Sequence, residues 1–152
     1  MAAEVGKPAP DFALKDTQNN VVSLSDFKGK KTLVVFFPFA FSGICQGELC
    51  TIRDNLASLN AVDANVVALS TDHRHSNRAF SEQQGFGFPV LSDFWPHGAV
   101  AQAYGCFNPD LGCAMRATYV LDEDGIVRAI VATDQVTEAR QFDSYQEALA
   151  SF

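Results

Sequence analysis

Residues 32–45 read TLVVFFPFAFSGIC. The first six form an unbroken apolar run of strand length, and Pro38 ends it because proline cannot donate a hydrogen bond to a neighbouring strand. Beyond Cys45, apolar residues recur at spacings of three and four, as on a helix that packs against a sheet: Leu49, Ile52, Leu56 and Leu59. The stretch therefore predicts a buried strand, a turn, and a helix that begins near Cys45.

Cys45 is expected in or beside the first turn of this helix. Backbone N–H groups at a helix start have no intrahelical acceptor, and the helix dipole places its positive end there, so an anion is stabilised. Such settings lower the pKa of a cysteine thiol from about 8.5 to roughly 3.5–7.5, and the thiolate is the nucleophilic form. The sequence thus predicts a reactive thiol at this position.

The rest of the chain follows an α/β pattern. Alternating residues around Phe12 and Leu14 lead through a polar turn into the run 21–24, which predicts an N-terminal hairpin. A second apolar run, 65–70, lies beyond the first helix, so the two runs are expected as parallel strands of a βαβ unit. Further helices are predicted at 74–84, 98–104 and 142–149, and a hairpin is predicted around Asp122-Glu123-Asp124-Gly125. The expected architecture is a mixed central sheet flanked by helices.

Composition limits the possible functions. The 152 residues are 47% hydrophobic and 19% charged, which fits one globular domain, residues 1–152, with a substantial core. A formal charge of −7 argues against binding to nucleic acid or to an anionic membrane, because both require a basic surface. No apolar run approaches the roughly 18 residues of a membrane span, and the first residues lack a signal-peptide pattern. We therefore expect a cytoplasmic protein.

Cysteine and histidine spacing indicates neither a disulfide framework nor a metal centre. Structural disulfides are rare in a reducing cytoplasm, and the chain has no C-x-x-C motif of a zinc ribbon or a thioredoxin dithiol. His73 and His75 are more simply read as a polar helix start. We expect no metal, haem or flavin. The cysteines are Cys45, Cys50, Cys106 and Cys113.

The spacing of Pro38, Ser42 and Cys45, Pro-x-x-x-[Thr/Ser]-x-x-Cys, resembles the peroxidatic motif of the peroxiredoxins. The segments 6–12 and 22–30 are similar to the N-terminal segments of that family, and Arg116 matches its active-site arginine. Residues 41–49 and 89–98 most resemble the alkyl hydroperoxide reductase E (AhpE) type of one-cysteine peroxiredoxin. The similarity extends over essentially the whole chain and implies a thioredoxin-like fold.

The resemblance implies a thiol-dependent peroxidase that reduces hydrogen peroxide and organic hydroperoxides. Cys45 would be the peroxidatic nucleophile and would form a sulfenic acid. Ser42 would offer its hydroxyl to the thiolate or the peroxide, although it could also simply cap the helix. Arg116 would supply positive charge and N–H donors, the alternative being a surface arginine. Pro38 would shield the pocket from water.

Three features leave alternatives open. The spacing of Cys45 and Cys50 resembles that of the PrxQ or bacterioferritin-comigratory branch, so Cys50 is either a resolving cysteine or a helix packing residue; Cys106 and Cys113 are weaker resolving candidates. Glu48 favours the helix start but opposes a nearby thiolate. Trp95 resembles a residue of a loop beside the active site and dimer contact, or is an ordinary buried aromatic.

Partners follow from the resemblance. It implies a homodimer and an external reductant: mycothiol with a mycoredoxin-like protein for the AhpE type, or thioredoxin if Cys50 resolves. The alternative function is a peroxide sensor or redox-switched holdase that uses the same Cys45 but reacts slowly. A thioredoxin-like reductase is disfavoured because C-x-x-C is missing.

Overall fold

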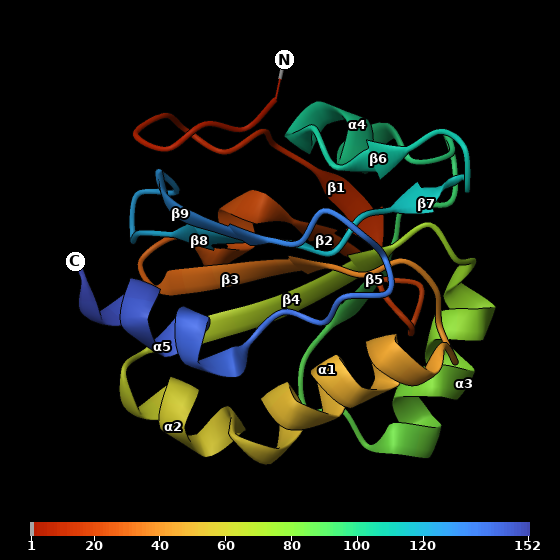
Figure 1. Ribbon diagram of the computed structural model, residues 1–152, viewed down its shortest axis with the longest axis horizontal. Helices are drawn as coiled ribbons and strands as arrows, with labels where there is room; N and C mark the ends of the chain where they lie inside the picture. Colours follow the sequence, from red (N-terminus) through yellow and green to blue (C-terminus); the bar gives the residue numbers. More distant parts are fainter. Residues whose placement is uncertain (1) are drawn as a thin grey trace.

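The computed structural model describes residues 2–152, and within them seven strands form one mixed sheet in the order β2-β1-β5-β4-β3-β8-β9 (Figure 1). Their bounds are β1 (Ala13–Lys15), β2 (Val21–Ser23), β3 (Lys31–Phe36), β4 (Ala64–Ser70), β5 (Val90–Ser92), β8 (Ala117–Leu121) and β9 (Val127–Ala132). The strands β3, β4 and β5 run parallel, as a βαβ unit requires, whereas β8 pairs antiparallel with both β3 and β9. The predicted βαβ unit and both predicted hairpins are confirmed.

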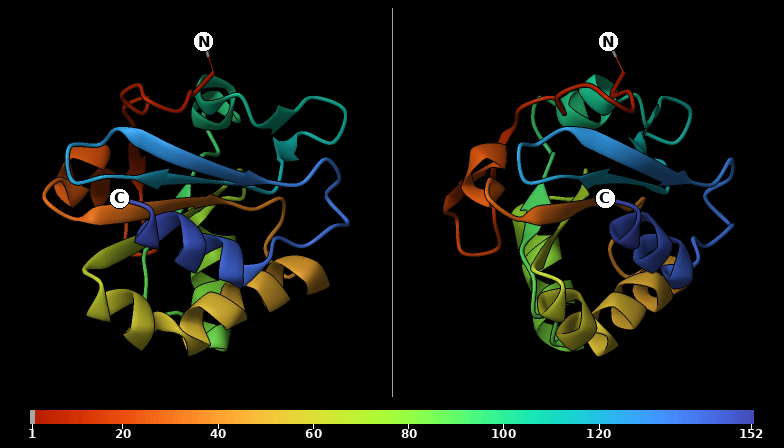
Figure 2. Two further views of the ribbon diagram at one scale, coloured as in Figure 1. Left: turned by 60° about the vertical axis from the view of Figure 1, so that its left-hand side comes forward. Right: turned by 90° about the vertical axis from the view of Figure 1, so that its left-hand side faces the viewer.

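Helices cover both faces of the sheet (Figures 1 and 2). On one face lie α1 (Gly43–Asp54), α2 (Leu56–Ala61), α3 (Arg74–Gln84) and α5 (Phe142–Ala150), and on the other lie α4 (Ala99–Tyr104) and the N-terminal segment. A 3-10 helix, η1 (Leu24–Phe27), follows β2, and a small hairpin of β6 (Phe107–Asn108) and β7 (Cys113–Ala114) precedes β8.

Alternation along β3 divides the core into two layers. Val34 and Phe36 pack into the cluster under α4, whereas Leu33, Val35 and Phe37 pack into the cluster under α1, α3 and α5. Successive strand residues point to opposite faces, so one fully buried strand serves both layers. Cys45 belongs to the second layer, and Cys106 belongs to the first.

Two details differ from the sequence pattern. The periodic stripe from Leu49 to Leu59 predicts one helix, but the chain leaves the helical conformation at Asn55, with φ −112° and ψ 14°. The Asn55 side-chain amide donates to the Thr51 carbonyl oxygen at 2.8 Å, a local bond that competes with helix continuation. The β6–β7 hairpin has two residues per strand, too short for any periodic signal.

No helix within residues 2–152 combines the length and the apolar character needed to cross a bilayer. Among the same residues, no group of three or more histidine, cysteine or acidic side chains is arranged to hold a metal ion.

Gly98 should be the least replaceable of the left-handed glycines. Its φ is +69°, and an added Cβ would overlap the ring of Phe107. We expect Gly98→Ala to lower the free energy of unfolding by about 2–4 kcal/mol, since backbone strain and overpacking add. Gly85, with φ +64° and open space around it, is the matched control, and Gly85→Ala should cost about 1 kcal/mol. Equal losses in urea unfolding would contradict the packing argument.

Candidate active site

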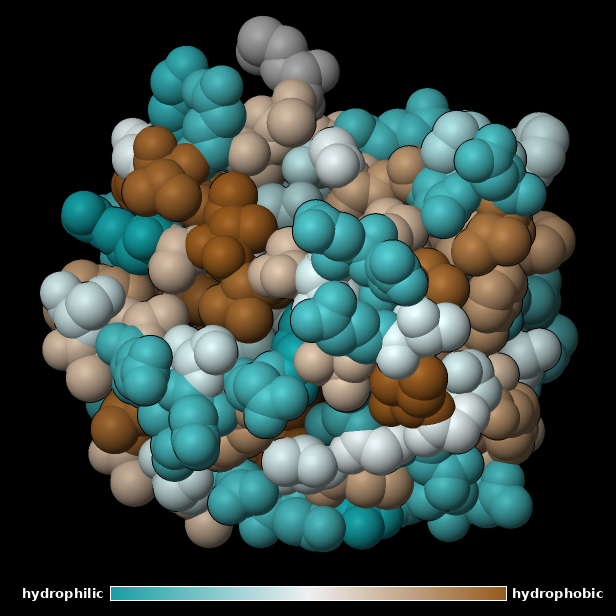
Figure 3. Space-filling view, in the orientation of Figure 1, coloured by the Kyte–Doolittle hydropathy of each residue, from teal (hydrophilic) through white to brown (hydrophobic). Residues whose placement is uncertain are grey.

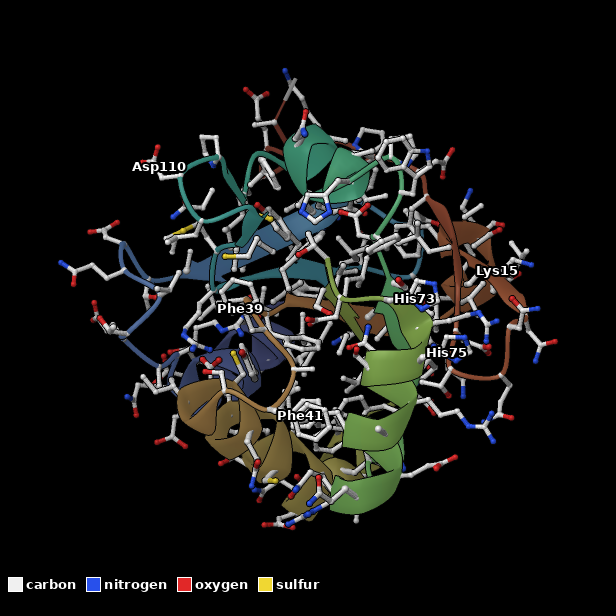
Figure 4. The ribbon with its side chains drawn as sticks, turned by 90° about the vertical axis from the view of Figure 1, so that its right-hand side faces the viewer. Lys15, Phe39, Phe41, His73, His75 and Asp110 are labelled. Atoms are coloured by element: carbon white, nitrogen blue, oxygen red, sulfur yellow. The ribbon has the colours of Figure 1, made fainter. Side chains whose placement is uncertain are left out.

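The candidate site lies where the carboxyl ends of two parallel strands meet. The chain leaves β3 through Phe37 and Pro38 and enters α1 at Gly43, while β4 ends at Ser70 beside it. The start of β8 reaches the same edge, because Ala117 pairs with Phe36. Crevices at this edge of α/β sheets are the usual place for ligands. Figure 4 shows this side of the molecule, with Phe39 and Phe41 near its centre.

Cys45 sits in the first turn of α1, two residues after Gly43, and its side chain is fully buried. The first backbone N–H groups of the helix have no intrahelical acceptor, as predicted, so they and the helix dipole favour an anion here. The ladder begins only with the Gln46 N–H, which donates to the Ser42 carbonyl oxygen at 2.8 Å.

The turn before Cys45 is fixed by backbone contacts. Pro38 is buried, and the Ala40 N–H donates to Oδ2 of Asp72 at 2.8 Å, which ties the turn to the end of β4. Phe41 has φ +67°, a strained value for a residue with a large side chain. Ser42 occupies the N-cap position, yet its side chain makes no capping hydrogen bond. The simple capping role is therefore wrong, and the hydroxyl is free for another partner.

A buried ionic cluster lies one helical turn beyond Cys45. Oε1 of Glu48 accepts from Nη1 of Arg116 at 2.6 Å and from Nη2 of Arg140 at 2.9 Å. Oε2 of Glu48 accepts from the backbone N–H of Arg140 at 2.6 Å and from its Nε at 2.9 Å. All three side chains are at most 4% exposed. Arg116 is thus buried at the site, and the alternative of a surface arginine is wrong.

The cluster is not electrically balanced. Two guanidinium groups and one carboxylate leave one positive charge inside the protein. Burial alone would raise the pKa of Glu48, but the hydrogen bonds and charge of Arg140, with the charge of Arg116, hold it below its usual value. Glu48 therefore stays ionised, and the remaining positive charge favours an anion nearby.

Cys45 lies within electrostatic reach of this cluster. Burial alone would lower the pKa of Arg140; its hydrogen bonds to Glu48 raise it, and the charges of Tyr145, Glu48 and Cys45 add to that effect. The nucleophile and the ionic cluster are therefore coupled electrostatically. The position of Glu48 near a thiolate, which looks unfavourable in sequence, is compensated by two arginines.

The two arginines differ in how many donors are used. Arg140 directs Nε and Nη2 to Glu48 and Nη1 to Oγ1 of Thr118. Arg116 directs Nε to the Val136 carbonyl oxygen at 2.5 Å and Nη1 to Glu48, and its Nη2 makes no hydrogen bond within residues 2–152. Arg116 thus keeps a donor for a ligand, whereas Arg140 mainly holds Glu48.

Sequence reasoning missed Arg140. It lies in the irregular segment before α5, ninety-two residues from Glu48, and no spacing or motif marks it. One signal was available: a glutamate in the first turns of the cysteine helix needs a buried counter-charge if it faces the core. That signal predicts a buried cation but does not identify which arginine supplies it.

The other cysteines lie in different surroundings, and all four are free thiols within residues 2–152. Cys50 is half-buried and its Sγ donates to Oε1 of Gln84 at 3.5 Å, so it faces α3. Five helical residues separate it from Cys45 by about 140° around the axis and about 7.5 Å along it. Burial raises the pKa of Cys106 to about 12 and that of Cys113 to about 11.

A hollow of about 450 Å³ lies between α1 and α5. Glu48 and Arg140 form part of its lining, together with Gly47 and Tyr145, but Cys45 does not. This hollow therefore gives access to the ionic cluster.

Large apolar side chains gather at the surface around the site. We call them the exposed apolar face; they are Phe39, Phe41, Phe94, Trp95 and Leu111, with exposures of 40%, 49%, 44%, 80% and 51%. Phe94 packs edge-on against His73, and Leu111 follows Asp110. Figure 4 shows His73 and Asp110 on opposite sides of Phe39 and Phe41. The neighbouring face carries apolar side chains in separate patches (Figure 3). The alternative that Trp95 is an ordinary buried aromatic is wrong.

The chain is similar to known proteins over nearly its full length. The model of the AhpC/TSA family matches residues 5–130. Alkyl hydroperoxide reductase E of Mycobacterium tuberculosis is 46% identical, covering 97% of this chain and 96% of that protein, and a thioredoxin peroxidase of Echinococcus granulosus is 32% identical, covering 96% and 83%. The crystal structure of peroxidoxin BcpB from Mycobacterium tuberculosis matches with a TM-score of 0.85 at 29% identity, covering 97% and 95%. These matches confirm the predicted thioredoxin-like fold.

Glu48→Gln should be strongly destabilising, because it leaves two buried guanidinium groups without a counter-charge. We expect a loss of about 3–5 kcal/mol in the free energy of unfolding at pH 7. The folded-state pKa of Glu48 is lowered, so its contribution is complete above the usual glutamate value of about 4.3 and is lost as pH falls through the folded-state value. Urea unfolding across this pH range should therefore show the two proteins converging in acid.

Glu82 offers the matched control, since it pairs with Arg78 on the surface at 3.0 Å. Glu82→Gln should change stability by about 0.5 kcal/mol or less. A Glu48→Gln loss as small as this would contradict the proposed charge balance.

Proposed function

The chain belongs to the AhpC/TSA family, and we propose that it is a thiol-dependent peroxidase that reduces hydrogen peroxide and organic hydroperoxides with Cys45 as its nucleophile. The observation that carries the proposal is a buried cysteine at a helix start, coupled to an ionic cluster with one uncompensated positive charge. Both features stabilise the thiolate, which is the reactive form.

In the proposed reaction the Cys45 thiolate attacks one peroxide oxygen. The O–O bond breaks, the attacked oxygen stays on sulfur as a sulfenic acid, and the other leaves as water or alcohol after taking up a proton. Within residues 2–152, Nη2 of Arg116 and the hydroxyl of Ser42 make no hydrogen bond, so both are available to the peroxide oxygens. Donors fixed where charge develops lower the barrier to such a step.

Pro38 takes a passive role in this proposal. It is buried at the end of β3 and has no N–H group that would attract water. The side chain thus limits water access beside the thiol and fixes the turn that leads to Ser42. The chain's own residues supply every role in this scheme, and no metal or organic cofactor is assigned to it.

The oxidised enzyme is proposed to be regenerated by an external thiol. The similarity to alkyl hydroperoxide reductase E supports mycothiol with a mycoredoxin-like protein, and the similarity to a thioredoxin peroxidase supports thioredoxin. Resolution by Cys50 stays a prediction, and the folded α1 opposes it, because cysteine Cα atoms more than about 7 Å apart cannot bridge without backbone movement. Free thiols at all four cysteines of residues 2–152 support a cytoplasmic location.

Peroxide consumption with an excess of reducing thiol tests the function. Cys45→Ser should abolish it, and Cys106→Ser should leave it unchanged because Cys106 lies across the sheet. Arg116→Met should lower the second-order rate constant for peroxide about 10²–10³-fold, since it removes both charge and a free donor. Turnover that survives Cys45→Ser would contradict the proposal. Stoichiometric but slow oxidation of Cys45 would favour the sensor or holdase instead.

We also propose a homodimer that forms through the exposed apolar face. Five large apolar side chains are 40–80% exposed on this face, and exposed apolar groups of this kind mark association surfaces. Trp95, 80% exposed, is the side chain best suited to anchor it, because tryptophan is enriched among the residues that dominate binding energy.

Trp95→Ser should weaken the dimer by about 2 kcal/mol or more, which is about thirtyfold in dissociation constant. Val62 is the control, because it is 51% exposed but lies next to α2, away from this face. Val62→Ser should leave the dissociation constant unchanged. Analytical ultracentrifugation over a range of concentrations measures both, and a wild-type monomer would contradict the homodimer.

A further inference from the structure

The catalytic cycle needs a second thiol, and the structure separates the three candidates. Cys50 is on the same helix as Cys45 and faces α3. Cys106 packs in the core layer under α4, with the sheet between it and Cys45. Cys113 is fully buried but belongs to neither core cluster. Its surroundings are those of the candidate site.

Backbone contacts place Cys113 beside the turn that carries Cys45. The hydroxyl of Thr71 donates to the carbonyl oxygen of Gly112 at 3.3 Å, and the carboxylate of Asp72 accepts from the Ala40 N–H at 2.8 Å. Two consecutive residues at the end of β4 thus bridge the residue before Cys113 and the turn before Cys45.

The register of the sheet gives the same placement. Ala117 of β8 pairs with Phe36 of β3 in antiparallel orientation. The ladder ends at this pair, so the segment before Ala117 and the turn after Phe36 that leads to Cys45 leave the sheet at the same edge. Arg116, three residues after Cys113, accordingly reaches Glu48 in the cysteine helix.

We propose that Cys113 is an internal resolving cysteine, which attacks the sulfenic acid on Cys45 and forms a Cys45–Cys113 disulfide. This inference rests on the proposed peroxidase function. The sulfur of Cys113 bonds to the sulfur of Cys45, the S–O bond of the sulfenic acid breaks, and the oxygen leaves as water with the proton of the Cys113 thiol. Two equivalents of the external thiol then reduce the disulfide and are themselves oxidised to a disulfide.

The charge at Cys45 would keep Cys113 from ionising until Cys45 has been oxidised. Burial raises the pKa of Cys113 to about 11; the charges of Cys45 and then Asp72 raise it further, whereas Arg116 lowers it to a smaller extent. While Cys45 is a thiolate, Cys113 is held neutral. Oxidation of Cys45 to a neutral sulfenic acid removes the largest of these repulsions, while the effects of Asp72 and Arg116 stay, so the second thiol becomes easier to ionise after the first has reacted.

The first turn of α1 has features that favour local unwinding around Cys45. A disulfide requires Cα atoms within about 4.4–6.8 Å, and a loosened first turn would let Cys45 move into that range of Cys113. Ser42 provides no side-chain cap, Phe41 is strained at φ +67°, and Gly47 weakens the helix interior. Unwinding this turn therefore costs little free energy and relieves the backbone strain at Phe41.

Peptide mapping of the oxidised protein tests the proposal without any substitution. The protein is treated with one equivalent of hydrogen peroxide, blocked with an alkylating agent, denatured without reductant, and cleaved before aspartate residues. The cysteine peptides expected from the sequence are Asp26–Arg53 with Cys45 and Cys50, Asp93–Pro109 with Cys106, and Asp110–Leu121 with Cys113. We expect Asp26–Arg53 joined to Asp110–Leu121, and Cys50→Ser should give the same link.

Other maps overturn the inference. A link from Asp26–Arg53 to Asp93–Pro109, a loss of two hydrogens within Asp26–Arg53, or a persistent sulfenic acid on Cys45 with a free Cys113 would each exclude it. Any of these still leaves Cys45 oxidised, so the proposed function would stand. A Cys45 that peroxide leaves unmodified would contradict the proposed function, and the inference with it.

Sulfenic acid trapping supplies the second readout. With dimedone added at increasing delays after peroxide, the Cys45 adduct should persist about tenfold longer in Cys113→Ala than in wild type, because the intramolecular thiol is gone. Cys106→Ala is the matched buried control and should behave as wild type. Equal lifetimes in wild type and Cys113→Ala would overturn the proposal.

Discussion

The double salt bridge from Glu48 to Arg116 and Arg140 is the interaction on which the site depends. It joins α1, the start of β8 and the segment before α5, which are far apart in sequence. A buried ion pair gains little net stability, because desolvation offsets the attraction between the charges. These ion pairs matter because the charges do not balance. One carboxylate holds two guanidinium groups in place, and the remaining positive charge favours an anion at Cys45.

The turn that positions Cys45 joins a well-packed strand to a helix start that lacks a side-chain cap. β3, buried at every residue after Lys31, brings the chain to the site with a fixed direction. The turn after it includes a strained Phe41 and an N-cap Ser42 whose side chain does not cap. The sheet holds the thiol in one position for the reaction with peroxide. The weak helix start lets the thiol move when the sulfenic acid is resolved. Local stability differences of this kind are usual at functional sites.

Sequence alone predicted the elements whose signals are local. The apolar run of β3, the stripe of α1 and the Asp-Gly turn before β9 each lie within about fifteen residues, and the structure has all three. Cys45 and Ser42 were predicted at the helix start for the same reason. Arg140 was not, because its role depends on a contact ninety-two residues away, and neither the break at Asn55 nor the exposure of Trp95 has a periodic signal. The sequence does not indicate which side chains, far apart along the chain, are in contact in the fold.

The ionisation of Cys45 in two opposite charge variants tests the central claim most directly. In a protein whose other three cysteines are alanine, the ultraviolet absorbance of the thiolate can be followed near neutral pH. The account predicts that Arg140→Met lowers the thiolate fraction at Cys45 and that Glu48→Gln raises it, because the first removes and the second adds net positive charge. Circular dichroism of both variants shows whether they remain folded. Two folded variants that shift the thiolate fraction in the same direction, or not at all, would contradict the account.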